Sequence, residues 1–233
     1  PLAYPEVFDG PLTDDEVAEI LGDGEEVADA AVGDMRTVTD ANGEVAIPSN
    51  PQRIIALDEG TMTDLIALGV TPAAVQDWSR RDFSLFLDVD PDTIASVGTP
   101  EGPNFEAMLN IEPDLIIGRA ADLEWLPEGT QANLEEIAPA VFSPAMSTDW
   151  QAHLTFLGEM VGKEAEAAEL IAAYDARLAE FAAAWAASGQ DETVAIIRSR
   201  ADSFNIYAND SFIAETVKAA GIAMPESFAD IPG

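Results

Sequence analysis

Short apolar runs alternate with helix-like segments over the first 150 residues. Apolar runs predict strands at 53–57, 72–76, 113–118 and 140–142. The segments 61–68, 104–109 and 134–137 between them space their apolar residues as helices do. Strands that are apolar throughout are typical of a parallel sheet covered by helices on both faces, with right-handed crossovers. We therefore expect an α/β lobe over residues 36–147.

The chain ahead of this lobe differs in character. Residues 1–35 are acidic and poor in aromatic side chains, and we interpret them as an N-terminal extension with one or two helices. A β-hairpin is predicted next, with residues 35–40 and 44–47 flanking Ala41-Asn42-Gly43. Asn-Gly favours this because tight hairpin turns need positive φ angles.

From residue 148 the pattern becomes helical. A first helix is predicted over 149–161, ending at Gly162. Residues 163–187 then lack Gly and Pro and are rich in Ala, Glu and Leu, which favour helix. A helix of this length spans roughly 35–40 Å, more than a crossover helix in a small sheet needs. It is expected to join two lobes; a long surface helix is the alternative.

A second α/β unit is predicted after this helical segment, which we place at 148–188. Strands are expected at 193–197 and 204–207, followed by a helix at 211–220 that ends at Gly221. The residues from 189 to 233 are too few for an independent core. We therefore expect them to form only part of a C-terminal lobe.

Charge and cysteine content exclude several kinds of partner and site. The chain has 44 acidic and 10 basic residues, a net charge of −34. This surface repels nucleic acid and anionic lipid headgroups, so neither is expected as a partner. Cysteine is absent and His153 is the one histidine, which excludes thiolate sites and sites built from several imidazoles. No apolar run is long enough for a membrane span.

Half of the few basic residues follow predicted strands, where open parallel sheets bind ligands. They are Arg80, Arg81, Arg119, Arg198 and Arg200. Guanidinium groups suit carboxylate, hydroxamate and catecholate oxygens, so these arginines predict a site for an anionic ligand. Arg119 is expected to face Arg198 or Arg200 from the opposite lobe. The alternative is that each arginine pairs with a neighbouring carboxylate.

Aromatic side chains near the same edge are candidate walls of the site. Trp78, Trp125 and Tyr207 are proposed as ligand contacts, with core packing as the alternative for Tyr207. His153 lies on a predicted helix face and is interpreted as structural. Carboxylate pairs such as Asp58-Glu59 are inevitable at this acidity and carry little weight.

Several stretches resemble the iron-siderophore and cobalamin periplasmic binding proteins of ABC importers. The stretch from Gly43 to Leu57 resembles the opening of that family. Further matches, in order, are 64–70, 103–108, 112–117, 137–139, a helix over 165–178 with Tyr174 and Arg177, and 211–222. Each is weak alone, but together they extend over residues 36–233 in register.

The resemblance implies a fold and a function. The fold is two Rossmann-like α/β lobes with parallel sheets, joined by a single long helix, with the second lobe incomplete in this chain. The function is that of a non-enzymatic, extracytoplasmic protein, periplasmic or lipid-anchored at the cell surface through a segment outside this chain. It captures a ferric siderophore, needs no intrinsic cofactor or metal, and delivers the chelate to an ABC permease, with Glu106 docking on the permease.

Other functions remain open at this point. A cobalamin or haem carrier has the same fold, and a corrinoid needs less positive charge. An enzyme or metallocluster scaffold of this architecture normally needs cysteines, which are absent. A cell-surface interaction module whose cleft has lost its ligand is the remaining alternative. Phosphate-loop, dinucleotide-binding and nucleophile-elbow motifs do not occur.

Overall fold

The computed structural model describes residues 34–76, 89, 90, 93–99, 101–145 and 149–228. The chain divides into two compact units, residues 1–34 and 35–233. The N-terminal extension therefore lies almost wholly outside the described residues. Trp78, Arg80 and Arg81 also lie outside them.

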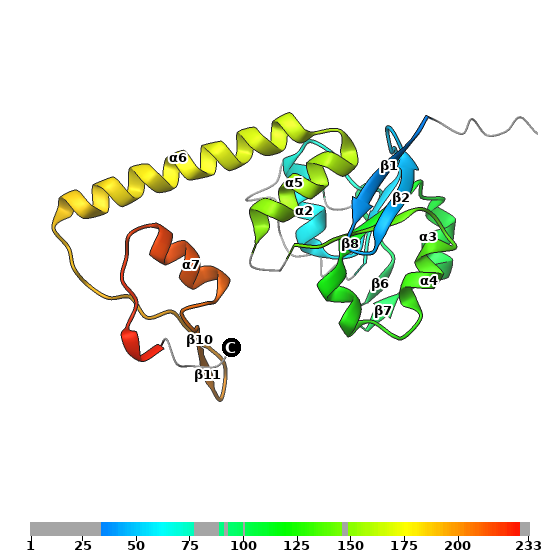
Figure 1. Cartoon of the computed structure of the whole chain (residues 1–233). Coiled ribbons are helices and arrows are strands. Elements are labelled where there is room, and N and C mark those ends of the chain that lie inside the picture. Colours follow the sequence, from blue (N-terminus) through cyan, green and yellow to red (C-terminus); the bar gives the residue numbers. More distant parts are fainter. Residues whose placement is uncertain (1–33, 77–88, 91–92, 100, 146–148, 229–233) are drawn as a thin grey trace, which may run out of the picture. The chain divides into compact units, whose positions relative to one another are not determined.

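A five-stranded parallel sheet organises the first part of the second unit (Figure 1). Its strands, in spatial order, are β5 (Ala95–Ser96), β4 (Ala74–Val75), β3 (Ile54–Ala56), β8 (Leu115–Arg119) and β9 (Ala140–Ser143). All four neighbouring pairs run parallel. The predicted parallel sheet is confirmed, and β3 lies at its centre.

Alternate residues of the strands enter two separate cores, one on each face of the sheet. Ile54 and Ala56 pack on one face, where α2 (Glu59–Ala67) and α5 (Trp150–Val161) cover them. Ile55 packs on the other face with residues of α3 (Phe105–Ile111) and α4 (Thr130–Glu135). Each fully buried aliphatic side chain stabilises the fold by about 2 kcal/mol. Burial on both faces explains why the strands are apolar at every position.

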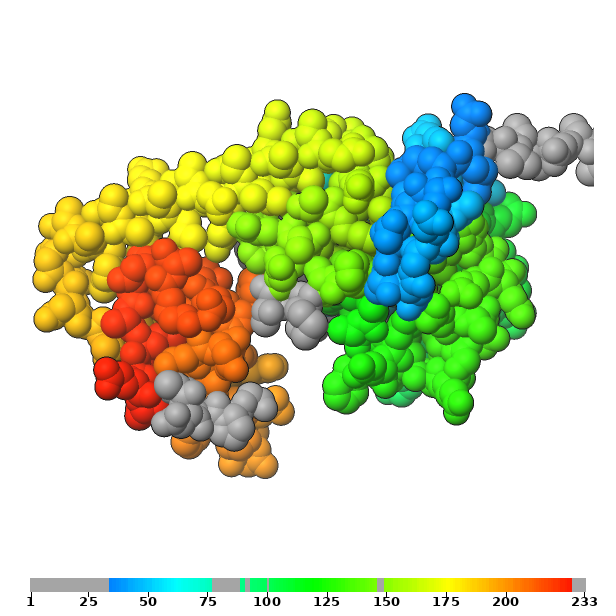
Figure 2. Space-filling model, in the orientation of Figure 1, coloured from blue at the N-terminus to red at the C-terminus, as the bar shows by residue number. Residues whose placement is uncertain are grey.

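The predicted hairpin is present as β1 (Met35–Asp40) and β2 (Gly43–Pro48), and it forms part of the molecular surface in Figure 2. Buried Asp40 ties it to the sheet, because its Oδ2 accepts the Phe142 N–H at 2.9 Å. Its Oδ1 accepts the N–H groups of Asn42 and Gly43 at 2.7 and 3.0 Å. Gly43 has a φ of 131°, a conformation that side-chain-bearing residues rarely adopt.

Helix α6 (Glu164–Ser188) comes after α5 and is unbroken over its whole length (Figure 1). The sequence predicts a helix over 163–187. Gly162, with φ of 67°, ends α5. The two helices approach closely where Gly158 faces Ala167. Trp150 packs edge-on against Tyr174, with 4.7 Å between the ring centroids. The role of α6 as a connection between lobes stays a prediction.

Residues 190–228 form a small group of elements. Strands β10 (Ile197–Ser199) and β11 (Phe204–Ile206) pair antiparallel, and α7 spans Phe212–Ala219. A strand at 193–197 was expected, but that range is wrong: β10 begins at residue 197, because its hydrogen-bonding partner is β11. Thr193 instead makes a single parallel bridge to Ala223.

Other boundaries also differ from the prediction. Helix α4 begins at Thr130 rather than at residue 134, because Gly129 takes up a left-handed conformation and the Thr130 hydroxyl donates to the Pro127 carbonyl. Three strands and two 3-10 helices in the described part of the chain were not predicted: β5, β6 (Gly98–Thr99), β7 (Gly102–Pro103), η2 (Ala120–Trp125) and η3 (Glu226–Phe228). The strands have two residues each, too few to show a periodic pattern.

Candidate functional site

The strand order reverses its direction at β3. The chain leaves β3 through α2 to β4 on one side, and later returns to β8 on the other side. Ligands of open parallel sheets bind at such a reversal, outside the carboxyl ends of the strands. The side chains at this edge belong to Asp58 after β3, Gln76 after β4 and Arg119 at the end of β8.

Asp58 is fixed by the helix that it starts. It caps α2, where its Oδ1 accepts the Thr61 N–H at 2.9 Å and its Oδ2 accepts the Thr61 hydroxyl at 2.6 Å. A carboxylate at a helix start satisfies free N–H groups and interacts favourably with the helix dipole. The cap therefore holds this carboxylate in one orientation at the strand end.

Arg119 is held between two carboxylates. Its Nη2 donates to Asp58 Oδ1 at 2.9 Å, and its Nε donates to Asp122 Oδ2 at 3.0 Å. Burial lowers the pKa of the guanidinium, but the charges of Asp58 and Asp122 outweigh burial and raise it. Arg119 therefore stays charged over the whole pH range in which the protein is folded. The sequence offers pairing with carboxylates as the alternative to ligand binding, and Arg119 makes such pairs.

A buried polar layer lies beneath this ion pair. The Thr61 hydroxyl donates its one proton to Asp58, so the contact of 3.2 Å to His153 requires a proton on Nε2 of the imidazole. Burial lowers the pKa of His153 to about 4, partly opposed by Asp58, so the ring is neutral at pH 7. Burial, aided by the charge of Asp58, raises the pKa of Asp64 to about 6.

A cavity of about 150 Å³ opens at this edge. Its lining combines apolar, charged and amide side chains: Leu57, Asp58, Gln76, Arg119, Asp122, Leu123, Trp125 and Leu126. Gln76 is only 3% exposed, and its Oε1 has no hydrogen-bond partner among the described residues. Trp125, by contrast, is 84% exposed at the rim.

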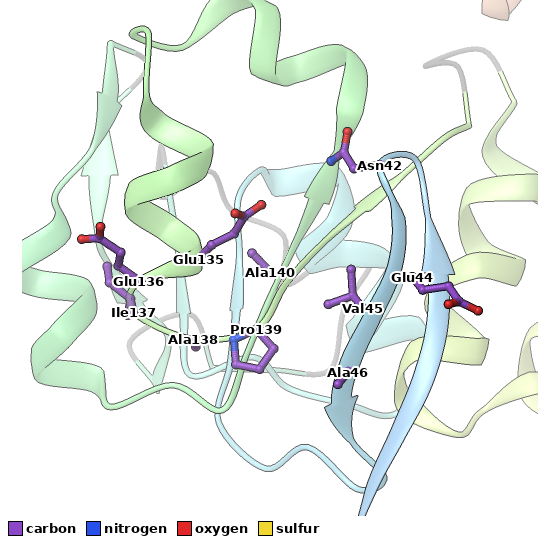
Figure 3. A pocket seen from close by; sticks show the side chains of 10 residues that line it. All are labelled: Asn42, Glu44, Val45, Ala46, Glu135, Glu136, Ile137, Ala138, Pro139 and Ala140. Atoms are coloured by element: carbon purple, nitrogen blue, oxygen red, sulfur yellow. The ribbon is translucent and has the colours of Figure 1, made fainter.

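A second, wider hollow of about 510 Å³ lies between the β1–β2 hairpin and the loop from α4 into β9 (Figure 3). It sits at the amino end of β9, away from the edge where parallel sheets bind ligands. Its charged lining residues are Glu44, Glu135 and Glu136. Figure 3 shows Glu44 and Glu136 extending in opposite directions, away from the hollow. The smaller cavity is therefore the better candidate site.

The structure places the predicted site residues in several regions. Arg119 and Trp125 line the same cavity. Arg198 is exposed on β10 and Arg200 is exposed just after it, while Tyr207 is half-buried and donates its backbone N–H to the Ile196 carbonyl. Glu106 is exposed in the first turn of α3. The roles proposed for these residues, and for Trp78, Arg80 and Arg81, stay predictions.

Sequence reasoning missed Asp58, Gln76 and Asp122 as site residues. Asp58 carried a usable signal, because an acidic residue between a strand and a helix is a typical cap. Asp122 is three residues beyond Arg119, which places the two within reach on a helical turn. Gln76 gave no signal, because only the packing around it reveals an unused acceptor.

The described residues offer neither a metal-binding cluster nor a membrane-spanning helix. They hold no group of three or more His, Cys, Asp or Glu side chains arranged to bind a metal ion. None of the helices described is both long and apolar enough to cross a membrane.

Comparison with known proteins identifies the family. The family described as periplasmic binding protein matches residues 54–227. The probable siderophore-binding lipoprotein YfiY of Bacillus subtilis is 33% identical over 199 residues, which make up 84% of this chain and 59% of that protein. The Fe(3+) dicitrate-binding periplasmic protein FecB of Escherichia coli is 28% identical over 203 residues, covering 83% of this chain and 63% of its own.

Solved structures agree on the fold. Staphylococcus aureus SirA complexed with staphyloferrin B has a TM-score of 0.68 and 24% identity, covering 83% of this chain and 65% of SirA. A periplasmic solute binding protein from Mycobacterium smegmatis has a TM-score of 0.67 and 25% identity, and the match covers 85% of this chain and 70% of that protein. The chain thus spans roughly 60% of the length of the curated relatives it matches. On this match and on its parallel sheet, the chain belongs to the periplasmic binding protein family.

Proposed function

We propose that this protein is an extracytoplasmic solute-binding protein that captures a ferric siderophore and delivers it to an ABC importer. The observation that carries the proposal is the cavity outside β3 and β8, where Arg119, Gln76 and Trp125 converge in a chain of this family. Relatives named for siderophore and ferric dicitrate binding support this ligand class. The protein acts by binding and release, without a chemical step of its own.

The ligand is a chelate rather than a bare ion. The chain has one histidine and no cysteine, and His153 is buried beneath the site with its Nε2 engaged by Thr61. A free transition metal would lack nitrogen and sulfur ligands here. The chelator must therefore bring the metal ligands, and the protein recognises the outside of the complex.

Further contacts are assigned to residues at other strand ends. Trp78, Arg80 and Arg81 follow β4 in the sequence, beside Gln76. Arg198, Arg200 and Tyr207 belong to the C-terminal elements, from which exposed guanidinium groups extend. We assign these residues to the remaining surface of the chelate, because the cavity itself is too small to enclose one.

Docking on the permease is assigned to Glu106. This carboxylate is exposed at the start of α3, a helix whose first turn is fixed by Asn104, which accepts the Ala107 N–H at 3.0 Å. An exposed acid on a rigid helix start suits a basic pocket on a partner. A lipid anchor preceding this chain would place the protein at the cell surface; otherwise it would be periplasmic.

Tryptophan fluorescence titration tests the proposal. The intact chain is titrated with a ferric hydroxamate, ferric citrate, a ferric catecholate, haem and cobalamin. Saturable quenching by one of the ferric chelates supports the proposal, and part of it should be lost in Trp125→Phe. Trp185→Phe, on the far half of α6, is the matched control and should keep the response. Quenching by haem or cobalamin alone favours the carrier alternatives, and no quenching by any ligand contradicts all of them.

A further inference from the structure

The cavity beside β3 and β8 contains an unused hydrogen-bond acceptor. Gln76 Nε2 donates to the Thr99 carbonyl at 3.4 Å, which directs Oε1 elsewhere. That oxygen is buried, and no hydrogen bond reaches it from the described part of the chain. A buried acceptor without a partner is unfavourable. Because Gln76 lines the cavity, a donor that enters the cavity can satisfy it.

The charge of the described lining also favours a donor. Two carboxylates, Asp58 and Asp122, face one guanidinium, Arg119, which leaves one negative charge in excess. The Nε and one Nη of Arg119 already donate to these carboxylates. That edge of the guanidinium is therefore not free to hold an anion in the two-pronged way that favours arginine. The net negative charge of these three side chains therefore favours a cation in this cavity.

The walls and the size of the cavity restrict what enters it. Leu57, Leu123 and Leu126 make its sides apolar, and the exposed Trp125 at the rim offers an aromatic face to a cation. A volume of about 150 Å³ corresponds to roughly five water molecules. This is room for a short side arm, not for a whole chelate.

We propose that the cavity is a subsite for a protonated amine carried on a short apolar arm of the captured chelate. The ammonium donates to Gln76 Oε1 and to the carboxylate of Asp122, while its alkyl stem lies against the leucines. The inference rests on the proposed function, which it narrows to ferric chelates with a free ammonium group. Chelates whose rim carries only carboxylates are expected to bind more weakly.

Ferrioxamine B provides the probe, because this ferric hydroxamate carries one free ammonium arm. Its N-acetylated form keeps the iron centre and the arm but loses the charge. Equilibrium dialysis against the intact chain, followed by the visible absorbance of the complex, measures both affinities. We expect the ammonium form to bind about tenfold more tightly, as charge-assisted hydrogen bonds allow. The ratio should fall with added salt, because ions screen the attraction.

Asp122→Asn tests the site itself, since this half-exposed side chain tolerates the change without a buried charge being left behind. The ratio of the two affinities should fall from about ten to about two, because the loss of one charged contact weakens binding by roughly that factor. Glu135→Gln, which removes a carboxylate beside the other hollow, should leave the ratio unchanged.

The outcomes separate the two proposals. Equal binding of both forms, tighter binding of the acetylated form, or an unchanged ratio in Asp122→Asn overturns the amine subsite and leaves siderophore capture standing. If neither form binds while ferric citrate or a ferric catecholate does, the amine subsite is overturned and siderophore capture stands. If those chelates fail as well, siderophore capture falls and the subsite falls with it.

Discussion

Arg119 and Asp58 join the carboxyl ends of β8 and β3 through a hydrogen-bonded ion pair of 2.9 Å, 61 positions apart in the sequence. The pair crosses the point where the strand order reverses, which is where this class of sheet binds ligands. Asp58 also caps α2, so the same carboxylate orders a helix and orients the guanidinium. Stability and the geometry of the candidate site are therefore linked through one side chain.

Replacing Asp58 separates these two roles. Asp58→Ala should lower the free energy of unfolding by about 2 kcal/mol, because the cap of α2 is lost and half-buried Arg119 loses one partner. Asp58→Asn keeps an oxygen for the cap and removes only the charge, so about half of that loss is expected. Urea unfolding followed by circular dichroism measures both. Equal losses in the two variants would contradict the dual role.

The opposed pKa shifts of Asp64 and His153 predict a pH dependence that is hidden in the intact protein. Folding raises the pKa of Asp64 from 3.8 to about 6, so the folded state binds more protons between these values and its stability falls as pH rises. Folding lowers the pKa of His153 from 6.5 to about 4, so stability rises with pH in nearly the same window. Each of the two groups changes the free energy of unfolding by at most about 3 kcal/mol, and the two changes nearly cancel because their signs are opposite.

Single variants should reveal the two contributions. Asp64→Asn is expected to gain stability relative to the intact chain as pH rises from 4 to 6, because a buried ionised carboxylate is removed. His153→Gln is expected to gain relative stability as pH falls from 6.5 to 4. Urea unfolding midpoints at pH 4, 5, 6 and 7 measure the differences. If the differences do not vary with pH, folding shifts neither the pKa of Asp64 nor that of His153, and the prediction is wrong.

The attachment of the hairpin depends on Asp40, whose carboxylate accepts three backbone N–H groups, including that of Phe142 in β9. Asp40→Ala should lower the free energy of unfolding by about 2–3 kcal/mol, because the buried Phe142 N–H loses its partner. Hydrogen exchange at Ala41 and Phe142 should accelerate. Glu44→Ala, an exposed change in the same hairpin, is the control and should stay within about 0.5 kcal/mol.

Much of the fold follows from local sequence, and the site does so only partly. The strands around Ile55 and Ile116 were predicted because burial on both faces requires apolar residues throughout. Arg119 was found because few basic residues follow strands. Asp58 and Asp122 were obscured by 44 acidic residues, and Gln76 is distinguished only by its surroundings. Strand β10 was misplaced because its pairing depends on a partner farther along the chain.

The corner between α5 and α6 requires a glycine at position 158. A Cβ there would lie 2.9 Å from the Ala167 Cβ and 3.0 Å from the Lys163 carbonyl oxygen. Gly158→Ala should therefore destabilise the protein by about 1–3 kcal/mol through overpacking. Ala167→Gly in the same chain should restore part of the loss, since it removes one of the two close contacts. A double-mutant cycle of unfolding free energies measures this coupling; purely additive effects would contradict it.

The most direct test of siderophore capture is a crystal of the intact chain grown with each of the three ferric chelates (hydroxamate, citrate and catecholate) and measured at the iron absorption edge. We expect one anomalous iron peak outside the carboxyl ends of β3 and β8, with the chelate in contact with Arg119 or Trp125. An iron peak in the hollow beside the β1–β2 hairpin, or crystals that take up none of the three chelates, would contradict siderophore capture at this edge of the sheet.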